Sequence, residues 1–476
     1  MCGVFGAYSK SDSVAEEVYL GLTALQHRGQ ESAGIAWIDG DRRVNVVKGM
    51  GLVHEALSQE DLSRTPATAA IGHVRYSTAG ASMIQNSQPI CANYAQGPVA
   101  IAHNGNLTNF HTLREALENR GAIFQSSCDS EVILQLLAHQ PKRRPLEALH
   151  RALGEARGAF SLVVLLEEGL VAARDPWGFH PLSLGRRGDN YYVASETSAF
   201  HLLGITFVRD IDPGEVLLAN EHGLSSYYLP AASTRKYLCS FEFVYFARPD
   251  SVIGGRSVYK ARREMGRRLA MGNVGEYCLT DERIEDADFV ASLPDSGTTA
   301  ALGYAAESGL TYEAAVVRNR YVGRTFIQPT QRVRELGVRI KLSPSPDLFS
   351  GKRVVLVDDS IVRGTTSGLV VSMIRECGTR AVHLCISSPP VRYPCFYGID
   401  TPSKGDLAAA NYTLEEISKF IGADSLRYLS KEDLIASIGL PADSLCTACF
   451  DGDYLDPPEE ARAGRCCVGN CERIFD

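Results

Sequence analysis

The sequence predicts two domains of different architecture, a layered α+β domain followed by an α/β domain with a parallel sheet. Short apolar runs bounded by Gly, Pro or Asn fill the first half, which is typical of strands, whereas strands and helices alternate in the second half. A chain of 476 residues is also too long for one ordinary core. We expect the boundary near 230–236, where Pro-Ala-Ala-Ser-Thr has the composition of a linker. The expected domains are therefore 2–232 and 233–476.

The elements of the first half follow from apolar runs of strand length and from two helical patterns. Residues 14–26 carry apolar side chains at helical spacing, and 130–139 begins with Ser130 and Glu131, which suit a helix N-terminus. Strands are expected at 69–74, 99–103, 160–166 and 191–194.

The second half changes pattern at 354–357, where four apolar residues follow Gly351-Lys352-Arg353 as in a buried parallel strand. Helical patterns follow at 368–376 and 414–421. This alternation predicts a βαβ sheet.

Composition and charge exclude several classes of function. The net charge of −8 argues against a nucleic-acid-binding surface, although a local basic pocket for a small phosphate ligand is compatible with it. No apolar run is long enough to span a membrane, and the N-terminus has no secretory signal. We therefore expect a cytoplasmic protein, in which the 13 Cys residues are thiols or metal ligands rather than disulfides.

Cys2 is the most informative residue of the first half. A small side chain after the initiator Met permits removal of Met1, and we expect this to be the only maturation step. Cys2 would then carry a thiol nucleophile and a free α-amine, whose pKa of about 7.7–8.0 lets it act as a base near neutral pH. The alternative is a cysteine of no function in a frayed terminus.

Cys2 belongs to the motif Cys2-Gly3-Val4-Phe5-Gly6, and three polar motifs follow it in the sequence: His27-Arg28-Gly29-Gln30, His73-Val74-Arg75-Tyr76-Ser77-Thr78 and His103-Asn104-Gly105-Asn106-Leu107. Taken singly, such motifs are turns or caps; Asn-Gly, for example, is a common hairpin turn. In this order they resemble the glutamine amidotransferase domain of the N-terminal nucleophile hydrolase type, over roughly the first 230 residues. The resemblance implies a four-layer αββα sandwich.

The same resemblance implies roles for individual residues. Cys2 would attack the side-chain amide of glutamine, and Asn104 with the backbone N–H of Gly105 would form the oxyanion hole. Arg75 would pair with the α-carboxylate of glutamine and Asp129 with its α-ammonium group, and Arg28 would also bind glutamine.

Residues 354–367 form the strongest motif of the second half. The apolar strand ends in Asp358 and Asp359, and a turn rich in Gly, Thr and Ser then opens a helix. Ligands of open α/β sheets bind at this end of the strands. Backbone N–H groups of 363–367 can cradle a phosphate, and the two acids can hold ribose hydroxyls directly or through Mg²⁺.

This motif resembles the binding loop for phosphoribosyl pyrophosphate (PRPP) in type I phosphoribosyltransferases. The resemblance implies that Asp358 and Asp359 join Ser296, from Pro294-Asp295-Ser296-Gly297-Thr298-Thr299, at Mg²⁺. Residues 322–327 resemble the mobile loop that closes over PRPP. Lys341, Arg332 and Arg334 add positive charge near this loop, or simply form a solvated basic face. The implied PRPP contacts are Asp358, Asp359, Arg363, Gly364, Thr365, Thr366, Ser367 and Arg324.

The order of the two domains resembles the glutamine-dependent PRPP amidotransferases, over nearly the whole chain. This implies that glutamine, PRPP and water give 5-phospho-β-D-ribosylamine, pyrophosphate and glutamate, the committing step of purine synthesis. It also implies inhibition by purine nucleotides and a homotetramer. An asparagine or hexosamine-phosphate synthase is disfavoured by the phosphoribosyl motif. A PRPP-sensing regulator without catalysis is disfavoured by Cys2 and its glutamine pocket.

Seven cysteines of the second half need separate treatment. Cys446-Thr447-Ala448-Cys449 alone is compatible with zinc, redox chemistry or neither. Four thiolates suit zinc or iron–sulfur by ligand count. The resemblance to the iron–sulfur branch of the family implies a structural [4Fe–4S] cluster on Cys239, Cys395, Cys446 and Cys449. Cys466, Cys467 and Cys471 match no ligand of the family.

Overall fold

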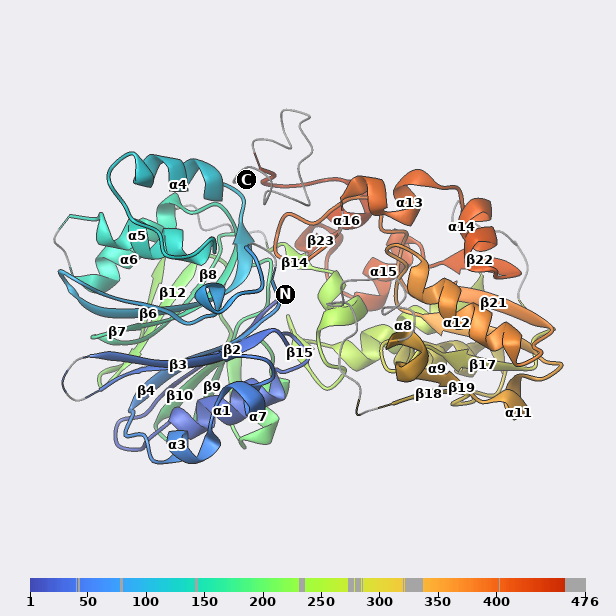
Figure 1. The fold of residues 1–476 in the computed structure, drawn as a ribbon, viewed down its shortest axis with the longest axis horizontal. Helices are drawn as coiled ribbons and strands as arrows, with labels where there is room; N and C mark the ends of the chain where they lie inside the picture. Colours follow the sequence, from blue (N-terminus) through green and yellow to red (C-terminus); the bar gives the residue numbers. More distant parts are fainter. Residues whose placement is uncertain are drawn as a thin grey trace.

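The computed structural model describes residues 1–458 except 40, 42, 78–79, 142–143, 231–235, 273–277, 279–283, 285, 320, 322–336 and 402. Two bodies lie side by side, with the N-terminus at the junction between them (Figure 1). The blue-to-green body holds the first half of the chain, and the yellow-to-red body holds most of the second half.

The first body contains two sheets that pack face to face. The seven-stranded sheet has the order β11(Thr206–Asp210)-β9(Ser183–Arg187)-β10(Asn190–Ala194)-β1(Gly3–Tyr8)-β4(Ala69–Arg75)-β2(Ser32–Ile38)-β3(Val44–Met50). The six-stranded sheet has the order β13(Gly223–Tyr228)-β12(Glu215–Asn220)-β8(Gly169–Arg174)-β7(Gly158–Leu166)-β6(Gly97–Leu107)-β5(Ile90–Tyr94). Apolar side chains of both sheets, among them Val4, Ile71, Ala102 and Val163, fill the space between them.

Helices cover the two outer faces of this pair of sheets. The first sheet is covered by α1(Ala15–Ala24), α2(Val53–Ala56), α3(Gln59–Ser63) and α7(Ser198–Leu202), and the second by α4(Phe110–Glu118), α5(Ser130–Ala138) and α6(Pro145–Glu155). The result is the expected αββα sandwich. The predicted strands and both predicted helices are confirmed, but Asn104-Gly105 lies inside β6 and is not a hairpin turn.

The second body is built on a parallel sheet of order β17(Phe289–Ser292)-β20(Arg353–Asp358)-β21(Ala381–Ile386)-β22(Ser425–Tyr428). One face packs on α8(Val258–Met271), α9(Thr298–Ser308) and α15(Lys431–Ile438), and the other on α11(Pro346–Phe349), α12(Thr365–Glu376), α13(Ala408–Asn411) and α14(Leu414–Ile421). The predicted strand and α14 are confirmed. Helix α12 starts three residues before the predicted start, because Gly364 adopts a left-handed conformation (φ +78°) that lets the helix begin at Thr365.

Short elements complete the second body and the junction. They are β14(Leu238–Cys239) paired in parallel with β23(Leu445–Cys446), the π-helical turn η2(Glu242–Phe246), the pairs β15(Val252–Ile253)–β16(Arg256–Ser257) and β18(Val316–Arg318)–β19(Leu342–Pro344), and α16(Ala448–Asp451). Single turns of 3₁₀ helix lie at η1(Ile84–Asn86), η3(Lys404–Asp406) and η4(Ala442–Ser444).

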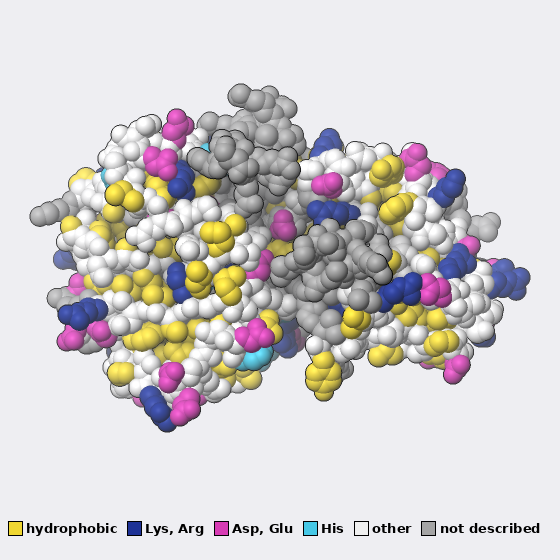
Figure 2. All heavy atoms as spheres, in the orientation of Figure 1, with side chains coloured by type: hydrophobic (Ala, Val, Ile, Leu, Met, Phe, Trp, Pro, Cys, Tyr) yellow, Lys and Arg dark blue, Asp and Glu magenta, His cyan; other side chains and the backbone are white. Residues whose placement is uncertain are grey.

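The surface charges and the helices can be compared with two expectations from the sequence, that the protein has no nucleic-acid-binding surface and no membrane span. On the face drawn in Figure 2, the described Lys and Arg side chains alternate with Asp, Glu and apolar side chains rather than forming one broad basic patch. None of the described helices combines the length and the apolar character that a membrane span requires.

Candidate active sites

Cys2 lies directly before the central strand β1, at the end of the sandwich that faces the second body. Strand β1 is held between β4 and β10, so the position of Cys2 is fixed on both sides. The backbone N–H of Cys2 donates to Oδ1 of Asn104 on β6 (3.0 Å). The two sheets therefore bring together the predicted nucleophile and a predicted oxyanion residue that are 102 positions apart.

Asn104 and Gly105 have the properties that an oxyanion hole requires. Asn104 is fully buried, and its Nδ2 group has no hydrogen-bond partner among the described residues. Such a buried donor is costly unless a ligand accepts from it. Gly105 has a φ of +153°, and a Cβ there would lie 2.1 Å from the carbonyl oxygen of Ala159. Only Gly fits this position.

The thiol of Cys2 is enclosed. Its side chain is 7% exposed, and Sγ donates to the carbonyl oxygen of Tyr76 (3.3 Å). Burial raises the pKa of the Cys2 thiol, while the nearby N-terminal amine and Arg75 act in the opposite direction. The thiol therefore needs a base to become a nucleophile.

Asp129 and Arg75 line the same end of the sandwich. Asp129 precedes α5, and its Oδ2 accepts from the backbone N–H of Leu107 (2.9 Å). Burial opposes ionisation of Asp129, but His103 and hydrogen bonds hold its pKa below the usual value, so it is a carboxylate. Arg75 ends β4 and donates to the carbonyl oxygens of Gly80 (3.2 Å) and Ala81 (3.1 Å). Its Nη1 lies 3.6 Å from Glu31.

Arg28 does not have the environment expected of a glutamine ligand. Its guanidinium is fully buried and forms ion pairs with Glu196 (2.5 Å) and Glu242 (2.7 Å), while Nε donates to the carbonyl oxygen of Cys2 (2.9 Å). These partners occupy most of its donors, since a buried guanidinium is stable only when carboxylates compensate it. Arg28 therefore holds the Cys2 backbone in place. None of its contacts supports the predicted role in glutamine binding.

The predicted PRPP site lies at the C-terminal end of β20. Asp358 and Asp359 are both buried, and the backbone N–H of Asp359 donates to Oδ1 of Asp358 (2.8 Å). Burial raises the pKa of both carboxyls, and the neighbouring acid raises that of Asp358 further. The hydroxyl of Ser296 hydrogen-bonds to Asp359. Ser296 follows the end of β17, and Asp358 and Asp359 lie at the end of its neighbour β20. These are the three residues for which the sequence predicted a shared Mg²⁺.

The predicted phosphate cradle follows immediately. Helix α12 begins at Thr365 after the left-handed Gly364, so the N–H groups of Thr365, Thr366 and Ser367 have no intrahelical acceptor. Arg363 is close enough to Asp400 to lower the pKa of that acid, whose burial nevertheless leaves it raised. Arg324, Arg332 and Arg334 lie outside the described residues.

The four cysteines predicted to bind a cluster line one enclosed cavity. Cys239, Cys395, Cys446 and Cys449 share it with Phe179, His180, Tyr397, Ile399, Ala448 and Tyr454. Cys239 and Cys446 are register partners on β14 and β23. Burial raises the pKa of each thiol, and neighbouring cysteines and acids raise the pKa values of Cys239, Cys446 and Cys449 further. Cys466, Cys467 and Cys471 lie outside the described residues.

Sequence reasoning missed several residues at the junction. Glu196 and Glu242 hold Arg28, and the hydroxyl of Tyr76 donates to Asp400 of the second body. Each is an isolated polar residue whose partner is remote in sequence. No local pattern signals such a pair, so only the folded structure reveals it.

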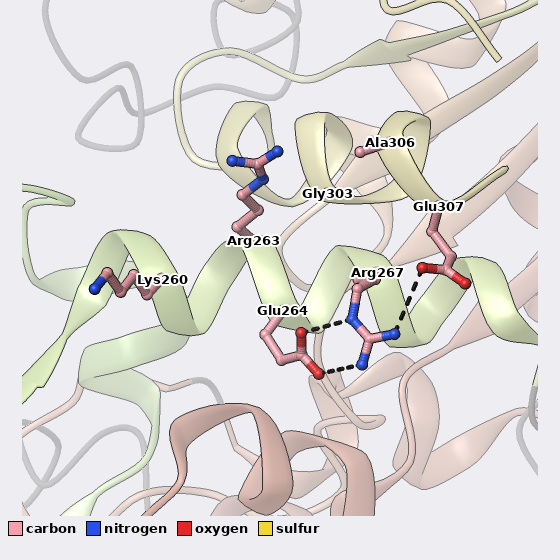
Figure 3. Close-up of a pocket in the computed structure, with 7 residues that line it drawn as sticks. All are labelled: Lys260, Arg263, Glu264, Arg267, Gly303, Ala306 and Glu307. Atoms are coloured by element: carbon pink, nitrogen blue, oxygen red, sulfur yellow. Dashed lines mark hydrogen bonds and ion pairs between the residues drawn. The ribbon is translucent and has the colours of Figure 1, made fainter. Parts of the chain in front are cut away.

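A separate groove of about 390 Å³ lies between α8 and α9. Figure 3 shows Arg267 of α8 held by Glu264 of the same helix and by Glu307 of α9. None of the residues that line this groove is a predicted site residue.

Comparisons with known proteins agree with this geometry. A family model described as "Glutamine amidotransferase domain" matches residues 73–202. The chain is 47% identical over 471 residues to an amidophosphoribosyltransferase of Methanocaldococcus jannaschii (95% of this chain, 97% of that protein) and 45% identical over 458 residues to one of Bacillus subtilis (95% and 94%). It is 46% identical over 465 residues to amidophosphoribosyltransferase 1 of Arabidopsis thaliana (98% and 80%).

A solved structure gives the same result. The B. subtilis glutamine PRPP amidotransferase complexed with ADP and GMP superposes with a TM-score of 0.87 at 44% identity, covering 96% of this chain and 98% of that one. The chain therefore belongs to the amidophosphoribosyltransferase family, the glutamine- and PRPP-dependent transferases of purine biosynthesis.

Proposed function

We propose that Cys2, Asn104 and Gly105 release ammonia from glutamine, and that Asp358, Asp359 and the start of α12 bind the PRPP that this ammonia attacks. The observation that carries the first half of this proposal is the pairing of Cys2 with Asn104. Oδ1 of Asn104 accepts from the Cys2 backbone, which leaves its buried Nδ2 free to donate to a ligand beside the nucleophile.

The first half-reaction is acyl transfer to sulfur. After removal of Met1, the α-amine of Cys2 takes the thiol proton, and the sulfur attacks the side-chain carbonyl carbon of glutamine. The oxyanion is stabilised by Asn104 Nδ2 and the N–H of Gly105. The amide nitrogen leaves as ammonia after it receives the proton, and water cleaves the thioester to glutamate. Asp129, ionised in its buried site, pairs with the glutamine ammonium, and Arg75 pairs with the carboxylate.

The second half-reaction joins ammonia to the anomeric carbon of PRPP as pyrophosphate departs. The N–H groups at the start of α12 hold the 5-phosphate, and Asp358 and Asp359 orient the ribose hydroxyls. Two adjacent buried acids with raised pKa values, beside the hydroxyl of Ser296, suit a hard cation that prefers oxygen ligands. Ser296, Asp358 and Asp359 would hold Mg²⁺, which when bound neutralises charge on pyrophosphate.

We further propose that Cys239, Cys395, Cys446 and Cys449 hold a [4Fe–4S] cluster, as the resemblance to the iron–sulfur branch of the family implies. Cys239 and Cys446 are buried, Cys395 and Cys449 are partly buried, and thiolates at these positions would repel one another, so they need a cationic group to ionise. Four cysteines around one cavity suit a cluster held by four thiolates. The cluster would supply cross-links between distant segments.

We also propose that purine nucleotides inhibit at or beside the PRPP site and that the protein is a homotetramer. The complex of the B. subtilis relative with ADP and GMP supports the first point. Equilibrium competition between PRPP and each nucleotide, and light scattering, test these two statements.

Product analysis with each substrate omitted in turn tests the proposed reaction. With glutamine, PRPP and Mg²⁺ present, we expect pyrophosphate and glutamate to form in equal amounts. Omitting glutamine should stop pyrophosphate release unless ammonia is added. Pyrophosphate release that needs neither nitrogen source would contradict the proposal.

A further inference from the structure

The loop that carries Cys395 packs directly on the strand that carries the proposed oxyanion hole. The loop comprises residues 394–398 of the second body, and the strand is β6 of the first body. Gly398 is so close to Gly105 that a Cβ on Gly398 would lie 2.8 Å from the carbonyl carbon of Gly105 and 2.9 Å from its Cα. Backbone therefore meets backbone, with no side chain between them.

A hydrogen bond fixes the same contact along the strand. Nδ2 of Asn106, the residue after Gly105, donates to the carbonyl oxygen of Phe396 (3.0 Å). Gly105 is consequently enclosed on two sides, because a Cβ on it would also meet the carbonyl oxygen of Ala159 on β7 at 2.1 Å. The Gly105 backbone, which carries the proposed oxyanion donor, is therefore confined by β7 on one side and by residues 394–398 on the other.

The loop itself is held rigidly. Nε2 of His180 donates to the carbonyl oxygen of Tyr397 (2.5 Å), and the Tyr397 ring stacks on Phe179 with centroids 4.0 Å apart. The hydroxyl of Tyr454 donates to the carbonyl oxygen of Pro394 (2.5 Å). Within the loop, the N–H of Tyr397 donates to Sγ of Cys395 (3.3 Å).

We infer that residues 394–398 position the oxyanion hole of the glutamine site, with Gly398 and Asn106 as positioning residues. The inference rests on the proposed role of Asn104 and Gly105. Displacing a donor by a fraction of an ångström weakens its stabilisation of the developing oxyanion more than its interaction with bound glutamine, because the glutamine carbonyl carries less charge. Disturbing the contact thus lowers kcat for glutamine and spares binding. Because Cys395 is in the same loop, the cluster site and the glutamine site share one structural support.

Gly398→Ala tests this directly. The new Cβ must push against backbone atoms of Gly105, and φ at Gly398 is +110°. Gly188→Ala is the matched control, because Gly188 also has a positive φ (+59°) but its Cβ would meet nothing within 4 Å. We expect glutamine-dependent kcat to fall about tenfold or more in Gly398→Ala. The KM for glutamine, ammonia-dependent synthesis and the iron content should stay within about twofold of the control.

A binding measurement separates positioning from general damage. An aldehyde analogue of glutamine accepts the Cys2 sulfur at its carbonyl carbon, and the carbonyl π electrons move to an oxygen that lies in the oxyanion hole. Its affinity, measured by calorimetry, should fall by the same factor as kcat, whereas the affinity for glutamate should not. A parallel loss of ammonia-dependent activity, or values equal to those of Gly188→Ala, would overturn the inference.

Two further variants keep the test decisive. If Gly398→Ala does not fold, Asn106→Asp replaces the donor to Phe396 with an acceptor of the same size and should give the same pattern. Asn104→Ala should lower kcat by about 10²–10³. If Asn104→Ala has no effect, the proposed oxyanion hole fails; if only Asn104→Ala has an effect, the inference about residues 394–398 fails alone.

Discussion

The glutamine site and the PRPP site differ in how their charges are compensated. In the first, protein groups already stabilise the ionised form of Asp129, whose pKa lies below its usual value. In the second, burial raises the pKa values of Asp358 and Asp359, and the charge of Asp359 raises the pKa of Asp358 further. The predicted glutamine site thus keeps Asp129 ionised with protein groups alone, whereas the acid pair of the proposed PRPP site would need a cation to ionise fully.

Because of this difference, we expect substitutions at the two sites to impair different activities. Deleting one protein group at the glutamine site should abolish one half-reaction and leave the other intact. Altering the acid pair should impair synthesis from every nitrogen source, because ammonia and glutamine share that step.

The largest effect is expected for Cys2→Ala. Without the sulfur nucleophile, glutamine-dependent synthesis should fall at least about 10³-fold, while synthesis from added ammonia is retained. Cys377→Ala, at a partly buried thiol in the second body, is the control. Steady-state assays with both nitrogen sources measure the effect. Glutaminase activity that survives in Cys2→Ala would remove Cys2 from the mechanism.

Asp359→Asn should affect both nitrogen sources equally. Loss of one charge from the pair weakens the binding of the cation and of PRPP, so both activities should fall about 10²-fold and the Mg²⁺ concentration for half-maximal rate should rise. Asp347→Asn, at an exposed acid on α11, is the matched control. A fall confined to the glutamine-dependent reaction would contradict the assignment of Asp359 to the shared step.

Cys449→Ser tests the proposed iron–sulfur site formed by the four cysteines. The variant should lose its brown colour and its iron, and it should unfold at a lower temperature because cross-links between β14, the 394–398 loop and β23 are lost. Anaerobic iron and sulfide analysis with visible absorbance makes the measurement, with Cys377→Ser as control. Stoichiometric zinc in a colourless wild-type preparation would refute the cluster.

The sequence predicted a site well when the residues of that site are neighbours in the chain, and poorly when they are remote from one another. Asp358, Asp359 and the residues up to Ser367 lie on one strand, one turn and one helix, so their order alone predicted their place in the fold. Cys2, Asn104 and Asp129 come from remote segments, and it was the resemblance to a family that joined them. The partners of Arg28 could not be predicted, because Glu196 and Glu242 are 168 and 214 residues away and carry no motif.

The contact of Gly398 with Gly105 was equally hidden. A glycine in Pro-Cys-Phe-Tyr-Gly reads as a turn residue, and its positive φ alone would explain it. That it also allows two backbones from different bodies to touch is a property of the assembled fold. Sequence patterns predict elements well, but they do not predict which elements meet.

The smallest expected effect is that of pH on stability. Lowering the pH should destabilise the first body and stabilise the second. Burial lowers the pKa of His73 on β4 to about 3, while its Nε2 donates to the carbonyl oxygen of His103 (3.0 Å). In the unfolded chain the pKa of a histidine is about 6.5. The stability that this neutral histidine contributes is therefore complete above pH 6.5, and it falls by about 1.4 kcal/mol per pH unit below that value as the unfolded state takes up a proton.

The acid pair works in the other direction, because its raised pKa values make the metal-free second body less stable as pH rises above the usual range of an aspartate. Hydrogen exchange at pH 7 and pH 5.5, with metal removed, measures the two bodies separately. Lowering the pH should weaken protection of β4 and strengthen that of β20. His73→Gln, which keeps an N–H donor, should abolish the change at β4 alone, whereas His54→Gln at an exposed position should not. Equal pH responses in both bodies would show that the contrast between the two sites does not govern their stability.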